Sequence, residues 1–371
     1  MNIEALNADC RAALEIFPSN HFDSVVTDPP YALTSITRRF GAEGVAPPKV
    51  GKTGVYARSA AGFMGKKWDN GDVAFAPEFW SEILRVLKPG GYVAAFGGSR
   101  TYHRLACAIE DAGFIIHPMF GWLFGQGFPK AHKVEDTAWE GWAYGAQSTK
   151  PAMEPICFAQ KPFSEKTGTA NVLRWRTGAV NIDGCRVEID PTVDDPRLGG
   201  QGDWSSGKMA KNVYEGGYAG IRVSSSPKGR WPANLCHDGS AEVLAAFPNS
   251  DGQLAAVGPA NGPKSSINVY GDYGPREQCE PRNDSGSAAR FFYCAKASKQ
   301  DRAGSKHPTV KPINLIRWLA RLVTPPNGLI LDPFAGSGTT GAAAHLEGFR
   351  AVLVEREAEY FADIERRLAA L

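Results

Sequence analysis

The sequence predicts an α/β fold whose open, mostly parallel sheet is built from both ends of the chain. Two apolar strands, 22–27 and 329–332, lie just before prolines, and helical patterns alternate with them. Alternating strands and helices are typical of a parallel sheet that helices cover. A glycine-rich loop after the second strand opens another helix. Because such sheets bind ligands beyond the carboxyl ends of their strands, both loops are candidate site segments.

The order of these patterns predicts one main domain with a large insertion. The chain has 371 residues with 43% apolar side chains, which exceeds what one compact core needs. Helices are expected at 10–18, 77–88, 100–114 and 311–323, and strands at 22–27, 92–96, 115–124 and 329–332. Glycine, proline and serine interrupt every periodic run between about 160 and 294. We therefore expect a main domain formed by 1–164 and 295–371, with a loop-rich domain at 165–294 inserted between them.

Composition argues against several classes of protein. No stretch approaches the length of a membrane span, and the first ten residues lack the basic and apolar regions of a signal peptide, so a soluble cytoplasmic protein is expected. The seven cysteines form no C-x-x-C pair, which argues against a zinc site and a disulfide framework, and no metal is predicted. A net charge of +2 argues against a general polycation but permits a local basic surface.

The segment Asp28-Pro29-Pro30-Tyr31 leaves the first strand as a stiff elbow. Proline cannot continue a sheet ladder, and it holds the residue before it extended. The Asp28 carboxylate, the Pro29 carbonyl and the Tyr31 ring are therefore expected to point into the crevice beyond the strand. Taken alone, such a segment is more often an ordinary turn.

The glycine-rich loop, Gly336-Ser337-Gly338-Thr339-Thr340-Gly341, matches the G-x-G-x-x-G pattern of dinucleotide sites, with Glu355 ending the next strand. Asp332 would repel the phosphates of a dinucleotide but would attract a cationic cofactor. Because one helix follows Glu355, the remaining strands of the sheet are expected from the N-terminal segment. S-adenosylmethionine fits this loop: Asp332 can pair with its ammonium, the amides of Ser337 to Thr339 can approach its carboxylate, and Glu355 can accept both ribose hydroxyls.

Six segments in order resemble the amino-methyltransferases of DNA, in the β arrangement, where the D-P-P-Y motif precedes the target-recognition region and the F-x-G-x-G motif follows it. The segments are "NADC", "VTDPPY", "LKPGGYVAAFGG", "EPICFAQKP", "HPTVKP" and "LDPFAGSGTT". The resemblance implies a Rossmann-like S-adenosylmethionine-dependent methyltransferase sheet with circularly permuted motif order, and a target-recognition domain at 165–294. It also implies a homodimer. Stretches such as "FYCAKASKQDR" and "GFMGKKWD" look most like methylases of phages and prophages, so a bacterial or phage-encoded protein is expected.

The resemblance also assigns roles to residues of the cofactor site. Asp9 and Cys10 are implied to border the adenine of the cofactor, Thr309 and Lys311 to lie near it, and Phe334 to pack beside it. The implied cofactor site comprises Asp9, Cys10, Asp28, Thr309, Lys311, Asp332, Phe334, Ala335, Gly336, Ser337, Gly338, Thr339, Thr340 and Glu355. His307 is expected to have a capping or structural role, because methyl transfer to an amino group needs no imidazole base.

The expected catalytic residues are Asp28, Pro29, Pro30 and Tyr31. An exocyclic amino group is a poor nucleophile because its lone pair is delocalised into the ring. Asp28 and the Pro29 carbonyl offer two acceptors that would localise this pair and stabilise the positive charge of the transition state. Tyr31 supplies a ring face on which a base flipped out of double-stranded DNA can stack.

Grouped basic side chains predict the surface that binds DNA. The irregular segment 32–75 is expected to clamp phosphates and to close over the site, and the inserted domain is expected to contact the grooves. The residues proposed from these two segments are Arg38, Arg39, Lys66, Lys67 and Trp68, then Arg174, Arg176, Lys208, Lys211, Arg222, Lys228 and Arg230. Each single basic residue is more often a solvated surface charge.

The sequence leaves several functions open. Transfer to the N6 amino group of adenine is the leading hypothesis, because Asp at the first motif position is more usual in that group. Transfer to the N4 amino group of cytosine is the main alternative, and a DNA-binding module without catalysis is a more distant one. A nicotinamide-dependent dehydrogenase and an enzyme acting on protein or RNA are the remaining hypotheses.

Overall fold

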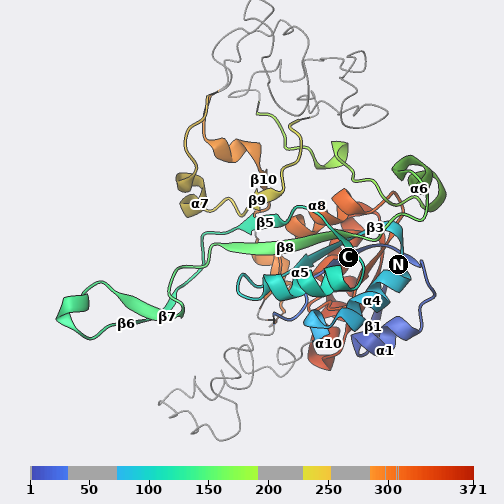
Figure 1. Ribbon diagram of the computed structural model, residues 1–371, viewed down its shortest axis with the longest axis horizontal. Coiled ribbons are helices and arrows are strands. Elements are labelled where there is room, and N and C mark those ends of the chain that lie inside the picture. The colour runs from blue at the N-terminus through green and yellow to red at the C-terminus, as the bar shows by residue number, and fades with distance from the viewer. Residues whose placement is uncertain are drawn as a thin grey trace, which may run out of the picture. The chain divides into compact units, whose positions relative to one another are not determined.

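The computed structural model describes residues 2–31, 73–190, 229–251, 285–296, 298–305, 307 and 309–371 (Figure 1). The chain divides into two compact units. Unit 1 comprises Met1–Asn181, Asn234–Ser240 and Cys294–Leu371, and unit 2 comprises Ile182–Ala233 and Ala241–Tyr293. Both ends of the chain therefore belong to unit 1, as a sheet shared between them requires.

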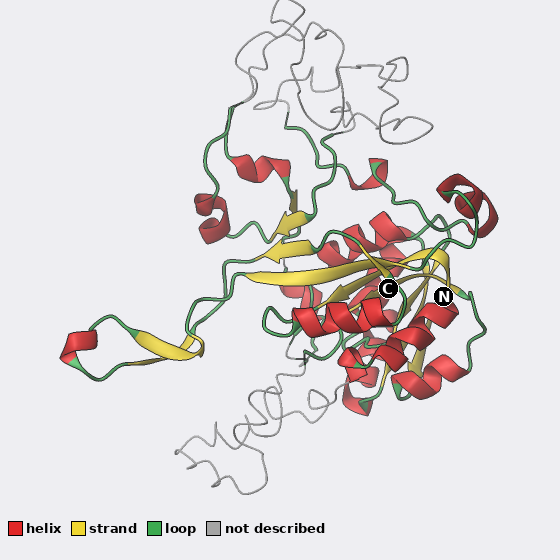
Figure 2. Cartoon of the chain, viewed as in Figure 1, coloured by secondary structure: helices red, strands yellow, loops and turns green. Residues whose placement is uncertain are grey.

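A mixed sheet forms the centre of unit 1 (Figure 2). Its parallel part consists, in spatial order, of β1 (Ile3–Asn7), β12 (Arg350–Glu355), β11 (Leu329–Asp332), β2 (Phe22–Thr27) and β3 (Leu87–Phe96). Beyond β3 follow β8 (Met153–Gln160), β5 (Phe120–Leu123), β9 (Leu235–His237) and β10 (Tyr293–Cys294), and β4 (Ile115–Ile116) pairs with β8. Strand β8 runs antiparallel to both β3 and β5. The predicted α/β class with a Rossmann-like sheet is confirmed.

The order of strands reverses between β11 and β2, which come from opposite ends of the sequence. Ile330 pairs with Ser24 and Leu331 with Val25, in parallel register. The chain adds β12 on one side of this pair and β3 on the other. In open α/β sheets such a switch point leaves a crevice at the carboxyl ends of the two strands. The two candidate loops therefore begin side by side.

Helices cover both faces of this sheet. On one face lie α1 (Cys10–Glu15), α4 (Pro77–Val86) and α5 (Tyr102–Asp111), which share a hydrophobic core with Val25, Leu331 and Val352 of the strands. Side chains of a strand alternate between faces. Leu353 accordingly meets the other layer, where it touches Gly341 of α9 (Thr339–Glu347). Helix α8 (Ile313–Val323) packs against α9, and α10 (Ala358–Ala369) packs against β1 and α9.

The sheet differs from the prediction at the segment Pro89-Gly90-Gly91. The helix was expected to run to these residues, but α4 ends at Val86 and β3 continues through them. The sheet overrides the local preference, because Gly90 and Lys161 hydrogen-bond and Asn171 donates to the Pro89 carbonyl at 2.8 Å. Gly90 has a φ of +83°, and a Cβ there would lie 2.5 Å from Asn171 Nδ2. Glycine is therefore required inside this strand.

Several elements of unit 1 were not expected from the sequence. Strand β1 pairs with β12, and a hairpin of β6 (Lys130–Lys133) and β7 (Ala143–Gln147) carries the 3-10 turn η4 (Thr137–Trp139). Other short elements among the described residues of unit 1 are η3 (Val73–Phe75), α6 (Gly168–Trp175) and η9 (Lys299–Arg302). Because α6 belongs to unit 1, unit 2 begins later than the expected boundary at 165.

The described residues of unit 2 form few regular elements. They are η5 (Asp183–Cys185), α7 (Ala241–Ala246) and η8 (Ala288–Phe291). The guanidinium groups of Arg230 and Arg290 both lie over the ring of Phe291, at 5.1 and 4.4 Å. Arg290 also donates to the carbonyls of Ser250 and Gly286. Cation–π contacts and arginine-to-backbone hydrogen bonds thus hold the described part of this unit together.

Two kinds of feature are absent from the described ranges. None of the helices found there combines the length and apolar character needed to cross a bilayer. The same residues hold no group of three or more His, Cys, Asp and Glu side chains arranged to bind a metal ion.

Candidate active site

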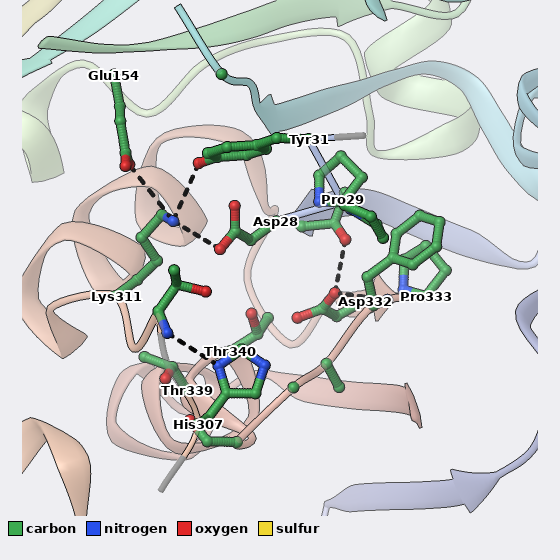
Figure 3. A pocket seen from close by; sticks show the side chains of 18 of the residues that line it. Asp28, Pro29, Tyr31, Glu154, His307, Lys311, Asp332, Pro333, Thr339 and Thr340 are labelled. Atoms are coloured by element: carbon green, nitrogen blue, oxygen red, sulfur yellow. Dashed lines mark hydrogen bonds and ion pairs between the residues drawn. The ribbon is translucent and has the colours of Figure 1, made fainter. Parts of the chain in front are cut away.

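A cleft of about 650 Å³ in unit 1 opens where β2 and β11 end. All of the expected catalytic residues line it, and so does every residue of the expected cofactor site except Gly338. Figure 3 shows the side chains of both loops around this cleft. The segment Asp28 to Tyr31 and the glycine-rich loop, which are distant in the sequence, therefore line the same cleft, as expected.

Asp28 lies at the centre of a buried polar cluster. Its Oδ2 accepts a hydrogen bond from Lys311 Nζ at 2.6 Å, and Nζ also donates to the Tyr31 hydroxyl at 3.2 Å (Figure 3). Glu154 forms an ion pair with the same ammonium at 3.4 Å. Among the described residues, none donates a hydrogen bond to the buried Oδ1 of Asp28. The cluster therefore keeps one carboxylate oxygen of Asp28 as an unused acceptor.

Tyr31 is held in place at the wall of the cleft. The Thr101 hydroxyl donates to the Tyr31 carbonyl at 2.9 Å, and a Cβ on Gly98 would lie 3.1 Å from the ring. Burial raises the pKa of Tyr31 well above its ordinary value, and Asp28 and Glu154 raise it further. The phenol therefore stays protonated, and its ring is fixed before any ligand enters.

Asp332, at the end of β11, is fixed by hydrogen bonds of its own. Its Oδ1 accepts hydrogen bonds from the Thr27 hydroxyl at 2.7 Å and from the Phe334 amide at 3.1 Å. Burial raises the pKa of Asp332 to about 6, and the nearby Asp28 contributes to this increase. Hydrogen bonds from Thr340 and Thr27 act in the opposite direction and lower the pKa. A cation entering the cleft would relieve this electrostatic cost.

The glycine loop is braced by Glu355. The Gly336 amide donates to Glu355 Oε2 and the Glu357 amide to Oε1, both at 2.8 Å. Gly336 and Gly338 have φ values of +52° and +78°, in the left-handed region that favours glycine. Burial raises the pKa of Glu355 to about 7, with these two amides working against the increase.

His307 packs against this loop. A Cβ on Gly336 would lie 3.3 Å from His307 Nε2, and the imidazole meets the Tyr360 ring edge-on at 4.5 Å. Its Nδ1 accepts a hydrogen bond from the Thr309 amide at 3.3 Å. Burial lowers its pKa, so the ring is neutral. These contacts agree with the structural role expected for His307.

The first turn of α1 and the Phe334 ring form one apolar part of the wall. The Asp9 side chain caps α1 by accepting from the Arg11 amide, and burial raises the pKa of the Cys10 thiol to about 12. Phe334 meets Phe79 of α4 with ring centroids 5.3 Å apart. The cleft thus combines an apolar wall with carboxylates at its ends.

The family model described as DNA methylase, with the short name N6_N4_Mtase, matches residues 22–366 of the chain. The chain belongs to this DNA methylase family. The match spans both candidate loops and the inserted unit between them. The expected membership of a family of DNA amino-methyltransferases is confirmed at the level of DNA methylases. The β arrangement and the likeness to phage enzymes stay predictions.

Individual proteins show more limited similarity. The chain is 28% identical over 204 residues to the type II methyltransferase M.HindIII of Haemophilus influenzae, which covers 47% of this chain and 63% of the relative. It is 43% identical over 65 residues to the putative methylase YubD of Escherichia coli, covering 18% and 29% of the two chains. The chain thus spans less than two thirds of the length of either relative.

Two solved structures of similar fold are a complex of M1.HpyAVI with SAM and the PvuII DNA methyltransferase, described as cytosine-N4-specific. They are 15% and 16% identical, with TM-scores of 0.41 and 0.48. The alignments cover 98% and 99% of this chain, and 99% and 86% of the other chains.

The structure describes only three of the expected DNA-binding residues, Arg174, Arg176 and Arg230. Arg38, Arg39, Lys66, Lys67, Trp68, Lys208, Lys211, Arg222 and Lys228 lie outside the described residues. Arg174 pairs with Glu165 at 2.6 Å, and Arg176 is the exposed left-handed residue that ends α6. Arg230 lies over Phe291 within unit 2. A role in DNA binding for any of these residues stays a prediction.

Three residues that line the cleft were missed or placed differently by the sequence analysis. Glu154 opens the segment "EPICFAQKP" but was given no role, although a carboxylate at the start of an otherwise apolar strand was a usable signal. Lys311 was expected near the cofactor, and the structure places its ammonium against Asp28. The third, Thr27, ends β2 and binds Asp332 through a contact 305 positions apart, which no local pattern could indicate.

Proposed function

We propose that this DNA methylase transfers a methyl group from S-adenosylmethionine to the N6 amino group of an adenine flipped out of double-stranded DNA. One observation supports it above all: the Asp28 elbow and the Gly336 loop open into the same cleft. A methyl donor held by one loop and an amino group held by the other would then meet directly.

The residues of the cleft fit a cationic cofactor. Asp332 and Glu355 are buried carboxylates whose pKa values are raised by burial, to about 6 and about 7, and each is also raised by another carboxylate. A ligand that carries ammonium and sulfonium charges relieves this cost, whereas the phosphates of a dinucleotide would increase it. Asp332, the Gly336 loop and Glu355 would hold S-adenosylmethionine, which supplies an electrophilic methyl group on its sulfonium sulfur.

On the other side of the cleft, Asp28 provides the acceptor for the target. Its Oδ1 accepts no hydrogen bond from any described residue, and it is buried, so an amino group that reaches it gains a strong partner. Together with the Pro29 carbonyl it would hold both N–H groups and point the nitrogen lone pair away from the ring plane. Positive charge that develops on the nitrogen then lies beside a carboxylate in a site of low dielectric.

Tyr31 and the rest of the elbow would receive the flipped base. An aromatic ring fixed in advance offers a stacking surface worth about 1–3 kcal/mol, which offsets part of the cost of unstacking the base from the duplex. The β arrangement, the likeness to phage enzymes, a homodimer, and target recognition by the inserted unit are parts of the same proposal.

A single experiment tests the reaction and the target atom together. The protein is incubated with labelled S-adenosylmethionine and unmethylated double-stranded DNA, and the DNA is digested to nucleosides. We expect N6-methyladenine. N4-methylcytosine would correct the target, and cofactor binding without any incorporation into DNA would favour a DNA-binding module that has lost catalysis.

A further inference from the structure

Glu154 is a carboxylate inside the cleft that the proposed reaction leaves without a role. It lies on β8 two residues before Ile156, which is 0% exposed, and alternation along a strand places both side chains on the same face. Its side chain is 23% exposed. A charge at a position that faces the core is costly unless it is paired. The position therefore needs a specific reason for a carboxylate.

The partner of Glu154 is the ammonium of Lys311, whose side chain is 7% exposed. An ammonium has three donors. Two oxygens accept hydrogen bonds from this one, Asp28 Oδ2 at 2.6 Å and the Tyr31 hydroxyl at 3.2 Å. Glu154 Oε2 lies 3.4 Å away as an ion-pair partner and accepts no hydrogen bond from a described residue. Its Nζ also lies 5.0 Å from the centroid of the Phe96 ring. The cation is thus shared between two carboxylates and cannot turn away from the cleft without losing both.

This sharing determines what Asp28 presents to the cleft. With Glu154 ionised, Lys311 is drawn to two negative charges and binds only one oxygen of Asp28. Without the charge of Glu154, Asp28 alone would attract the ammonium, which would then compensate the Asp28 charge more completely. The negative potential at Oδ1, where the amino group would bind, would fall accordingly.

We propose that Glu154 is a positioning residue for methyl transfer: it holds the Lys311 ammonium so that Asp28 keeps Oδ1 as an uncompensated acceptor for the target amino group. This inference rests on the proposed function. Burial raises the pKa of Glu154, as does Asp28, whereas the Lys311 ammonium lowers it and so favours the ionised carboxylate. Burial alone would lower the pKa of Lys311, but Asp28 and Glu154 raise it above its ordinary value.

A double-mutant cycle tests whether Glu154 acts through Lys311. In the full-length protein, Glu154→Gln keeps the shape of the side chain and removes its charge. We expect kcat for methyl incorporation into DNA to fall about tenfold, in the range of coupled neighbouring groups. The dissociation constant of the cofactor and the KM for DNA should stay within about twofold, since in this proposal Glu154 acts on the Lys311 ammonium and contacts neither ligand itself.

The decisive measurement is the same substitution in a Lys311→Met background. If Glu154 acts by holding the ammonium, Glu154→Gln costs nothing once the ammonium is gone, and it restores some activity by removing a carboxylate that repels Asp28. An unchanged tenfold loss in the Lys311→Met background would overturn the proposal, as would wild-type kcat in the single variant. Glu154→Asp, which keeps the charge, should restore part of kcat.

Two controls separate this proposal from others. Glu347→Gln removes an ion-paired carboxylate from the end of α9, where Glu347 binds Arg317 and Arg321 away from the cleft, and should leave kcat unchanged. Thermal melting of each variant excludes loss of fold as the cause. Failure of the wild-type protein to methylate DNA would refute the proposed function itself. If the wild type is active and Glu154→Gln leaves kcat unchanged, only the role of Glu154 is refuted.

Discussion

The two sides of the cleft differ in how their carboxylates are satisfied. On the cofactor side, Asp332 accepts from Thr27 and the Phe334 amide, and Glu355 accepts from two backbone amides. On the target side, Asp28 binds Lys311 with one oxygen, and the other accepts nothing from the part of the chain that is described. One side is preorganised by its own hydrogen bonds, and the other keeps an acceptor ready for an incoming group.

This difference suggests that binding and chemistry are assigned to separate residues. Protein side chains that are already fixed lose little conformational entropy when a ligand binds to them. The cofactor side should therefore control the affinity for the cofactor. An acceptor that is used only when the target arrives can contribute more in the transition state than in the ground state. The target side should therefore control kcat.

The largest effect is expected from Asp28→Ala. Without the carboxylate, nothing compensates the positive charge that develops on the amino nitrogen, and kcat should fall by about 10²–10³-fold or more. Binding of S-adenosylmethionine, measured by calorimetry on the same variant, should remain within about threefold. Retained methyl transfer would remove Asp28 from its proposed role, and loss of cofactor binding would contradict the division between the two sides.

A matched pair of glycine substitutions examines the cofactor side. Gly338 and Gly348 have φ values of +78° and +75°, but a Cβ on Gly338 would lie 3.2 Å from Ile364, whereas Gly348 has nothing within 4 Å. Both changes to alanine should lower the free energy of unfolding by about 1–2 kcal/mol through the left-handed backbone. Only Gly338→Ala should weaken cofactor binding, by about tenfold. Equal affinities in the two variants would show that the loop does not hold the cofactor.

The pH dependence of cofactor binding follows from Glu355. Its pKa is raised by burial from 4.5 to about 7, so near neutral pH the free protein still carries part of this proton. Ribose hydroxyls that donate to the carboxylate favour its ionised form, so binding should release protons near pH 7 and weaken as pH falls below 7. In the free protein the sign is opposite: the raised pKa means that Glu355 lowers stability as pH rises from 4.5 to 7.

Calorimetry in buffers of different ionisation enthalpy measures this proton release. Glu355→Gln removes the titrating group, and in that variant both the release and the pH dependence between 6 and 7.5 should diminish. Asp332, with a pKa raised by burial to about 6, would account for what remains at the acidic end. Identical proton release in the wild type and the variant would rule out Glu355 as the ribose acceptor.

Much of the fold and of the site could be predicted from the sequence, because both depend on local signals of strong physical meaning. Strands that end in Asp-Pro or precede a glycine loop place side chains at the edge of a sheet, and a parallel sheet brings such edges together. Asp28, Asp332 and Gly336 were found in this way, and all three line the cleft. The need to complete the sheet also predicted that its remaining strands come from the N-terminal segment, whereas the direct pairing of β11 with β2 is a finding of the structure.

What the sequence did not predict depends on contacts between distant positions. The end of α4 was placed too late because Pro89-Gly90-Gly91 has the composition of a helix stop, while pairing with Lys161 keeps these residues in β3. The cluster around Asp28 combines residues 28, 154 and 311. Nothing within a short window indicates that the lysine of "HPTVKP" would meet the first loop. Long-range electrostatic pairing is set by topology, and local patterns do not carry it.

The smallest effect is expected where the two sides of the cleft touch, at the hydrogen bond from Thr27 to Asp332. Thr27→Val keeps the shape of the side chain and removes this donor at 2.7 Å, leaving the Phe334 amide on the same oxygen. The free energy of unfolding should fall by about 1 kcal/mol. The pKa of Asp332 should rise further, since a hydrogen bond to its ionised form is lost, and cofactor affinity at pH 7 should fall by a few fold.

A second buried threonine provides the control for this change. Thr324 and Ser24 share a hydrogen bond of 2.8 Å away from the cleft, so Thr324→Val should cost similar stability without changing cofactor affinity. With saturating cofactor, Thr27→Val should leave kcat unchanged, because Asp28 and Lys311 keep their contact. A fall in kcat at unchanged cofactor affinity would mean that Asp332 influences the acceptor across the cleft, and binding and chemistry would then have to be treated as one coupled electrostatic system.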